Sequence, residues 1–219
     1  MKKIVFLPLL LILFAMKPAQ KKRIIFFGDS ITQMGINPGG YIDRIHAYLK
    51  EQNKIDQYDL IGAGIGGNKV YDLYLRLETD VLEKKPDIVV IYVGINDVWH
   101  KTSGIGTDIE KYEQFYVALI KKMQKQDIQV VVCTPTVIGE KKMQQNPQDA
   151  DLQAYSAVIR RLAKNMNCRL VDLHDAFVSY IEVHNTDNAE SGILTTDRVH
   201  LTPIGNQLVA DQIIKTIQL

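Results

Sequence analysis

The sequence predicts an α/β fold built around a parallel sheet. Four apolar runs, "RIIFF", "DIVVIYV", "IQVVVC" and the shorter "CRLVDL", end at Phe27, Val93, Cys133 and Leu173. Nearly continuous apolar runs of this length are typical of strands that are buried on both faces, as in parallel sheets. Segments with apolar residues at helical spacing lie between the runs. Strands that alternate with helices in this way predict an open, doubly wound α/β domain.

The remaining elements follow from weaker patterns. The stretch "QYDLIGA", before Gly64, is a weaker run that predicts a fifth strand. The final segment predicts a helix with Thr202 as its N-cap and Pro203 as its first residue, because each residue type suits that position. Two other helices each present an apolar stripe, formed by Ile109, Tyr112, Phe115, Leu119 and Met123 in one and by Leu152, Tyr155, Ile159, Leu162 and Met166 in the other.

The composition indicates a single globular domain over residues 20–219 that does not bind nucleic acid. The chain has 219 residues, 46% of them hydrophobic, and a formal net charge of +1. A nucleic-acid partner would require an excess of basic residues. The two cysteines, Cys133 and Cys168, are too few for a disulfide scaffold, and we expect buried free thiols in place of a bridge.

Residues 1–19 have the pattern of a secretion signal. Two lysines precede the apolar run from Ile4 to Met16, which is shorter than the ~20 apolar residues that span a bilayer. We therefore expect an exported protein without a stable membrane span. An uncleaved signal that anchors the protein to the membrane is the alternative.

Candidate catalytic residues stand where the predicted strands end, which is where open α/β sheets bind their ligands. Ser30 follows the first strand, and a serine in this position is either a helix N-cap or a nucleophile. A nucleophilic serine needs a base, and His200 forms an Asp-x-x-His pattern with Asp197 before the last helix. Asp197 would accept from one imidazole nitrogen and leave the other facing Ser30.

Acyl transfer also requires hydrogen-bond donors for the oxyanion. The turn that contains Asn96 offers a side-chain amide, and the glycine-rich stretch "GIGGN" offers backbone N–H groups that no side chain blocks. A rival base is His174, which stands beside Asp172 and Asp175. It is equally well placed to be a metal ligand or a capping residue.

A second motif competes with this interpretation. Residues 62–67 match G-x-G-x-x-G, the pattern of dinucleotide-binding loops. The acidic residue that would hold a ribose about 20 positions further on is Asp87, which precedes its strand instead of following it. The motif therefore gives little support to a dinucleotide site.

Four blocks of the sequence, in order, resemble those of the SGNH hydrolases, also called GDSL esterases and lipases. They read "FFGDSITQ", "GAGIGGN", "VGINDVW" and "DRVHLTPIG". The resemblance implies that Ser30 is the nucleophile, with Asp197 as acid and His200 as base. It implies an oxyanion hole formed by Ser30, Gly67 and Asn96. It also implies a three-layer, flavodoxin-like fold with a five-stranded parallel sheet, and the hydrolysis of esters or thioesters without a metal or cofactor.

The short chain and its expected export favour a substrate with a short acyl group, and we expect O-acetyl groups on carbohydrates. Trp99 and His100 are expected to line the pocket and bind this substrate. A lysophospholipase or a thioesterase of the same family is an alternative, as is a non-catalytic glycan-binding protein on the same fold. A further alternative is a metal-dependent hydrolase built from Asp172, His174, Asp197 and His200.

Overall fold

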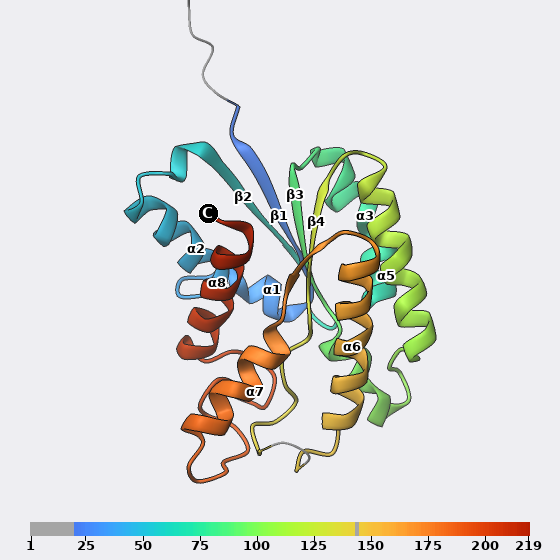
Figure 1. Cartoon of the computed structure of the whole chain (residues 1–219), viewed down its shortest axis with the longest axis vertical. Helices are drawn as coiled ribbons and strands as arrows, with labels where there is room; N and C mark the ends of the chain where they lie inside the picture. Colours follow the sequence, from blue (N-terminus) through green and yellow to red (C-terminus); the bar gives the residue numbers. More distant parts are fainter. Residues whose placement is uncertain (1–19, 143–144) are drawn as a thin grey trace, which may run out of the picture.

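The computed structural model describes residues 20–142 and 145–219, and its centre is a parallel sheet of five strands in the order β2-β1-β3-β4-β5 (Figure 1). This is the strand order of flavodoxin-like folds, so the predicted fold class is confirmed. The strands are β1 (Lys22–Gly28), β2 (Tyr58–Gly64), β3 (Ile88–Tyr92), β4 (Gln129–Cys133) and β5 (Arg169–Val171).

The described residues form eight α-helices. Helices α2 and α8 pack together on one side of the sheet, and α3, α5 and α6 pack on the other (Figure 1). The helices are α1 (Ser30–Gly35), α2 (Tyr41–Glu51), α3 (Val70–Asp80), α4 (Ile95–Trp99), α5 (Ile109–Gln124), α6 (Asp149–Asn165), α7 (Leu173–His184) and α8 (Pro203–Ile217).

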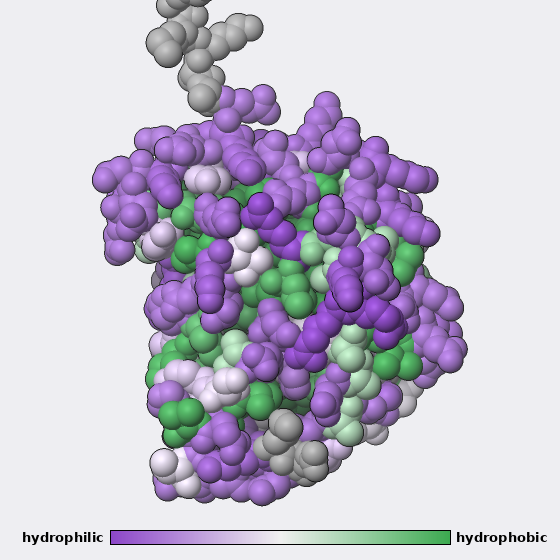
Figure 2. Space-filling model, in the orientation of Figure 1, coloured by the Kyte–Doolittle hydropathy of each residue, from purple (hydrophilic) through white to green (hydrophobic). Residues whose placement is uncertain are grey.

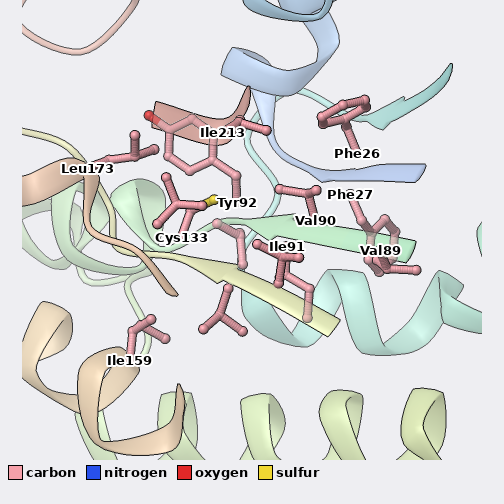
Figure 3. Packing of buried hydrophobic residues seen from close by; sticks show 14 of the residues in the cluster. Phe26, Phe27, Val89, Val90, Ile91, Tyr92, Cys133, Ile159, Leu173 and Ile213 are labelled. Atoms are coloured by element: carbon pink, nitrogen blue, oxygen red, sulfur yellow. The ribbon is translucent and has the colours of Figure 1, made fainter. Parts of the chain in front are cut away.

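The core lies on both faces of the three central strands. Figure 3 shows the side chains of β1, β3 and β4 between Ile159 of α6 on one face and Ile213 of α8 on the other. The edge strands are less buried: most of β2 is half-exposed, and β5 is fully buried only at Val171. An edge strand needs less apolar surface, which agrees with the weaker run "QYDLIGA" and the shorter run "CRLVDL" at the two edges of the sheet.

The distribution of polar and apolar residues on the surface follows the layers of the fold. Figure 2 shows polar residues over the outer helices and apolar residues between the two helix layers. Half-buried Leu170 of β5 and Leu208 of α8 line a shallow pocket at the β5 edge.

Cys168, directly before this edge strand, is only half-buried, so the expectation of two buried thiols is wrong for Cys168. Both Cys133 and Cys168 are free, as predicted.

The helices largely follow their predicted stripes, but Ile109 is only half-buried at the start of α5 and Met166 lies one residue beyond the end of α6. Thr202 caps α8, because its hydroxyl accepts a hydrogen bond from Gly205 N–H at 3.1 Å, and Pro203 is the first helical residue, as predicted. Phe115 of α5 is only half-buried as well. Its ring lies 6.3 Å from that of Tyr71 and 5.6 Å from that of Tyr74 in α3, so it joins two neighbouring helices.

The predicted secretion signal, residues 1–19, lies outside the described residues. Among the helices that the structure does describe, none has the length and apolarity needed to cross a membrane.

The strand register brings three segments to one edge of the sheet. Gly28, the last residue of β1, pairs with Gly64 of β2 on one side and with Tyr92 of β3 on the other. Parallel strands that end at the same level place the residues that follow them at the same edge of the sheet. The residues after β1, β2 and β3 are therefore neighbours, although they are far apart in the sequence.

Asp29 makes the turn from β1 into α1. It is buried, and its Oδ1 accepts a hydrogen bond from Ile31 N–H at 3.0 Å, as an N-cap residue does. Burial, reinforced by the nearby Asp97 carboxyl, raises the pKa of Asp29 to about 7, against the lowering effect of the Ile31 N–H. The side chain that begins the first helix is thus an acid that resists ionisation.

This raised pKa predicts how Asp29→Asn changes the pH dependence of stability. Between Asp29's ordinary pKa of 3.8 and about 7, the folded protein holds a proton that the unfolded chain has released, so the free energy of unfolding falls as pH rises. The variant lacks this titration. We expect its stability relative to the wild type to improve by more than ~1 kcal/mol from pH 4 to pH 7, measured by urea unfolding.

The matched control is Asp187→Asn, which changes an exposed carboxyl. Its stability relative to the wild type should be the same at every pH in this range. A constant difference for Asp29→Asn would contradict the raised pKa, whatever the sign of that difference.

Candidate active site

Ser30, His200 and Asp197 are joined by hydrogen bonds in series. The Oγ of Ser30 lies 3.0 Å from Nε2 of His200, and Nδ1 of His200 lies 2.6 Å from Oδ2 of Asp197. When Nδ1 donates to Asp197, Nε2 is the acceptor for the Ser30 hydroxyl. Ser30 is the first residue of α1 and Asp29 is its cap, so the interpretation of Ser30 as the N-cap is wrong.

The Asp197 carboxylate is fixed from three sides. Besides His200 Nδ1, the backbone N–H groups of His200 and Val199 donate to Oδ1 at 2.8 and 3.2 Å. Burial opposes the charge, but the hydrogen bonds from the His200 side chain and from the two N–H groups outweigh it and lower the pKa of Asp197. The carboxylate is therefore charged at neutral pH and holds the imidazole in one orientation.

The loop after β2 lies against Ser30. A side chain at Gly64 would overlap the backbone of Thr32 and Gln33, so glycine here lets α1 pack directly on β2. The Gln33 side chain then accepts from Gly66 N–H at 2.8 Å. A Cβ at Gly66 would lie 4.0 Å from that of Ser30. The glycines of the G-x-G-x-x-G motif thus serve helix packing and the approach of this loop to Ser30.

The predicted oxyanion donors are available. Gly67 has a φ of +76°, a conformation that favours glycine. Within the described residues, the N–H groups of Ser30 and Gly67 have no hydrogen-bond acceptor. Asn96 is buried, and its Nδ2 donates to the Asn68 carbonyl at 3.1 Å. An amide nitrogen carries two hydrogens, so one remains for a ligand.

Arg76 of α3 anchors these segments to one another. Its Nη2 donates to the Gly28 carbonyl at 2.7 Å and its Nη1 to the Ala63 carbonyl at 3.0 Å, at the ends of β1 and β2. Its Nε donates to Oδ1 of Asn68 at 2.8 Å. Our sequence analysis missed this residue. The available signal is a charged residue directly before Leu77 in the buried stripe of α3.

Asp97 fixes the end of the loop between β2 and α3, at the point where α3 begins. Its carboxyl is buried and accepts from Val70 N–H, the first residue of α3, at 3.2 and 3.3 Å. Burial raises the pKa of Asp97 to about 6, while the Val70 N–H and the charge of Lys69 act in the opposite direction. Asp97 therefore links the start of α3 to α4, the helix that carries Asn96.

His174 lies apart from this constellation. Its Nδ1 is 2.7 Å from the Thr136 carbonyl, and its ring lines a cavity of about 350 Å³ between α6 and α7. Asp172 caps α7 and is paired with Arg160 at 2.6 Å. Among residues 20–142 and 145–219, no three His, Cys, Asp or Glu side chains are grouped to hold a metal ion. The four residues considered for a metal site are thus not brought together.

Trp99 and His100 lie at the end of α4. Their rings are 5.7 Å apart, and Trp99 packs partly against the core. The Nδ1 of His100 is buried and has no hydrogen-bond partner in the described part of the chain. Burial, together with the charge of Lys69, lowers the pKa of His100. The neutral imidazole of His100 thus lies after Asn96 in the chain. The role of His100 in binding a substrate stays a prediction.

Known proteins share both the sequence pattern and the fold. A crystal structure of the acetyl xylan esterase AlAXEase is 56% identical, with a TM-score of 0.88 over 89% of this chain and 99% of that one. An acetylxylan esterase of Geobacillus stearothermophilus is 27% identical over 92% of this chain and 96% of its own length. An uncharacterized lipoprotein, YqeF, of Bacillus subtilis (strain 168) is 28% identical over 87% of both.

The family model agrees with these likenesses. Residues 26–208 match the GDSL-like lipase/acylhydrolase family, and this range holds Ser30, Gly67, Asn96, Asp197 and His200. The chain therefore belongs to the GDSL-like lipase/acylhydrolase family.

Proposed function

We propose that this protein is a serine esterase that removes short acyl groups, in particular O-acetyl groups from xylan and related carbohydrates. The observation that carries the proposal is the series of hydrogen bonds from Ser30 through His200 to Asp197, next to N–H groups that have no acceptor within the described residues. A serine hydroxyl with a base and an oriented acid is the arrangement that acyl transfer requires.

The reaction begins with attack by Ser30. The Nε2 of His200, 3.0 Å from Ser30 Oγ, takes the hydroxyl proton as Oγ bonds to the ester carbonyl carbon. Asp197 stabilises the imidazolium that forms. The lowered pKa of Asp197 keeps it charged for this task.

The negative charge that develops on the carbonyl oxygen is held by three donors. These are the N–H groups of Ser30 and Gly67 and the second hydrogen of Asn96 Nδ2. Their positions are set before the substrate arrives, by Asp29 at the start of α1 and by the Asn96 bond to Asn68. Donors that are already oriented stabilise the transition state without reorganisation.

The intermediate then breaks down in two steps. His200 returns its proton to the oxygen of the leaving alcohol, and the acyl group stays on Ser30 as an ester. A water molecule, deprotonated by His200, attacks this acyl-enzyme, and the acid is released as Ser30 regains its proton. The residues of this chain supply every proton transfer of the cycle.

The choice of acetyl esters rests on the relatives. The structure at 56% identity is that of an acetyl xylan esterase, and the Geobacillus stearothermophilus relative is an acetylxylan esterase too. Trp99 and His100 are proposed to bind the carbohydrate, since an aromatic ring packs well on a sugar face. The likeness to a lipoprotein and the signal pattern of residues 1–19 support export, where xylan would be met.

The main prediction concerns Ser30→Ala. The wild type should react with a fluorophosphonate probe and release acetate from acetylated xylo-oligosaccharides, whereas the variant should do neither and should lose at least ~10³-fold in kcat. Probe labelling is read on a gel and acetate by an enzymatic assay. The control Ser179→Ala changes a serine on α7 and should behave as wild type.

Two outcomes would contradict the proposal. A variant that keeps wild-type turnover would exclude Ser30 as the nucleophile. A wild type that binds acetylated oligosaccharides without labelling or hydrolysis would indicate a glycan-binding protein. Faster hydrolysis of lysophosphatidylcholine than of acetylated sugars would keep the mechanism and change the substrate class.

Removing the Asn96 donor should act on the transition state. We expect Asn96→Ala to lower kcat by ~10²- to 10³-fold, with KM changed by no more than about threefold, because the oxyanion forms only as the reaction proceeds. Steady-state kinetics with p-nitrophenyl acetate measure both constants. The exposed Asn37 gives the control Asn37→Ala, and an equal loss in both variants would contradict the assignment.

Trp99 and His100 should affect carbohydrate substrates selectively. We expect Trp99→Ala and His100→Ala each to raise KM several-fold for acetylated xylo-oligosaccharides and to leave KM for p-nitrophenyl acetate nearly unchanged, since the small ester lacks the sugar. His46→Ala, at an exposed position of α2, is the control. Equal changes for both substrates would indicate a packing role for these two residues.

A further inference from the structure

Glu140 is a fully buried acid that the catalytic steps do not use. It lies in the segment between β4 and α6, with 0% of its surface exposed. A buried carboxylate is costly unless its oxygens accept hydrogen bonds. Glu140 accepts four. Its Oε2 accepts from Ile193 N–H at 2.9 Å, and its Oε1 accepts from Leu194 N–H at 2.7 Å, from the Thr195 N–H, and from the Thr195 hydroxyl at 2.7 Å.

These donors belong to the base of the loop that carries Asp197 and His200. Thr195 pairs with Leu201 across the loop in an antiparallel bridge. The N–H and hydroxyl of Thr196 donate to the His200 carbonyl at 2.7 and 3.1 Å. The three consecutive N–H groups that meet Glu140 thus lead directly into the hydrogen bonds that shape the loop.

The backbone around Glu140 holds the same loop at two more places. Gly139 N–H donates to the Arg198 carbonyl at 2.9 Å, between Asp197 and His200 in the chain, and Glu140 N–H donates to the Glu190 carbonyl at 3.0 Å. The segment after β4 therefore contacts the loop at its tip and at its base. The carboxylate of Glu140 supplies the side-chain part of this attachment.

We propose that Glu140 is a positioning residue that sets the separation between His200 Nε2 and Ser30 Oγ. The inference rests on the proposed esterase function. Asp197 and His200 bond to each other within one loop, whereas Ser30 stands at the start of α1. A shift of the loop would therefore carry Asp197 and His200 away from Ser30 together. Glu140 opposes that shift by tying the loop to the segment that follows β4.

The central test is Glu140→Gln, which keeps the size of the side chain and replaces an acceptor oxygen with a donor that faces N–H groups. We expect kcat for p-nitrophenyl acetate to fall by roughly 10- to 100-fold, because a misplacement of ~1 Å can cost about 10² in rate. KM should stay within about threefold. A residue that served stability alone would lower Tm and leave kcat of the folded enzyme unchanged.

The control and a milder variant sharpen this test. Glu190→Gln changes an acid of the same loop whose half-exposed side chain pairs with Arg198 at 3.5 Å, and its kcat should match that of the wild type. Thr195→Val removes one donor to Glu140 and keeps the side-chain shape. We expect a loss of several-fold in kcat, and this variant carries the test if Glu140→Gln does not fold.

A crystal structure of the variant separates this inference from the esterase proposal. We expect His200 Nε2 to move beyond about 3.5 Å from Ser30 Oγ, outside hydrogen-bond distance, while the bond between His200 and Asp197 persists. An unchanged separation of 3.0 Å would overturn the inference. A displaced His200 in a protein that hydrolyses no ester would overturn the proposed function and leave the positioning role intact.

Discussion

The site depends first on the guanidinium of Arg76, which joins the ends of β1 and β2. Arg76 donates to the carbonyl groups of Gly28 and Ala63, at the ends of these neighbouring parallel strands, at 2.7 and 3.0 Å. It also lies 4.5 Å from the Phe27 ring. Only arginine offers several donors in one planar group. One side chain therefore fixes the strand before Ser30 and the loop that contains Gly67.

The site is assembled from two units held in different ways. Ser30, Gly67 and Asn96 follow β1, β2 and β3, whose register fixes their relative positions. Asp197 and His200 stand on a loop between α7 and α8 that has no strand beneath it. That loop is held by hydrogen bonds from its own backbone and by Glu140. The two units meet at the 3.0 Å bond between Ser30 and His200.

This division explains what the sequence predicted and what it did not. Buried strands require apolar runs, so the sheet was predictable, and its edges are the weaker and the shorter of the five runs. The pairing of Ser30 with His200 was predictable because the chemistry proposed for them restricts their residue types. Arg76 and Glu140 were not, because their partners are mainly backbone groups that any residue could supply, separated from Glu140 by 53 to 55 positions. The helix cap was misplaced by one residue, since Asp29 and Ser30 are both good caps.

Two buried carboxyl groups make the site a source of instability. Asp29 and Asp97 are both buried, and burial raises the pKa of each, to about 7 and about 6. A sequence selected for stability alone would avoid two buried acids this close together. Each acid, however, accepts from an N–H at the start of a helix, Ile31 in α1 and Val70 in α3. Ser30 is the first residue of α1 and Gly67 stands shortly before α3, so orienting the proposed oxyanion donors and burying these acids are one structural requirement.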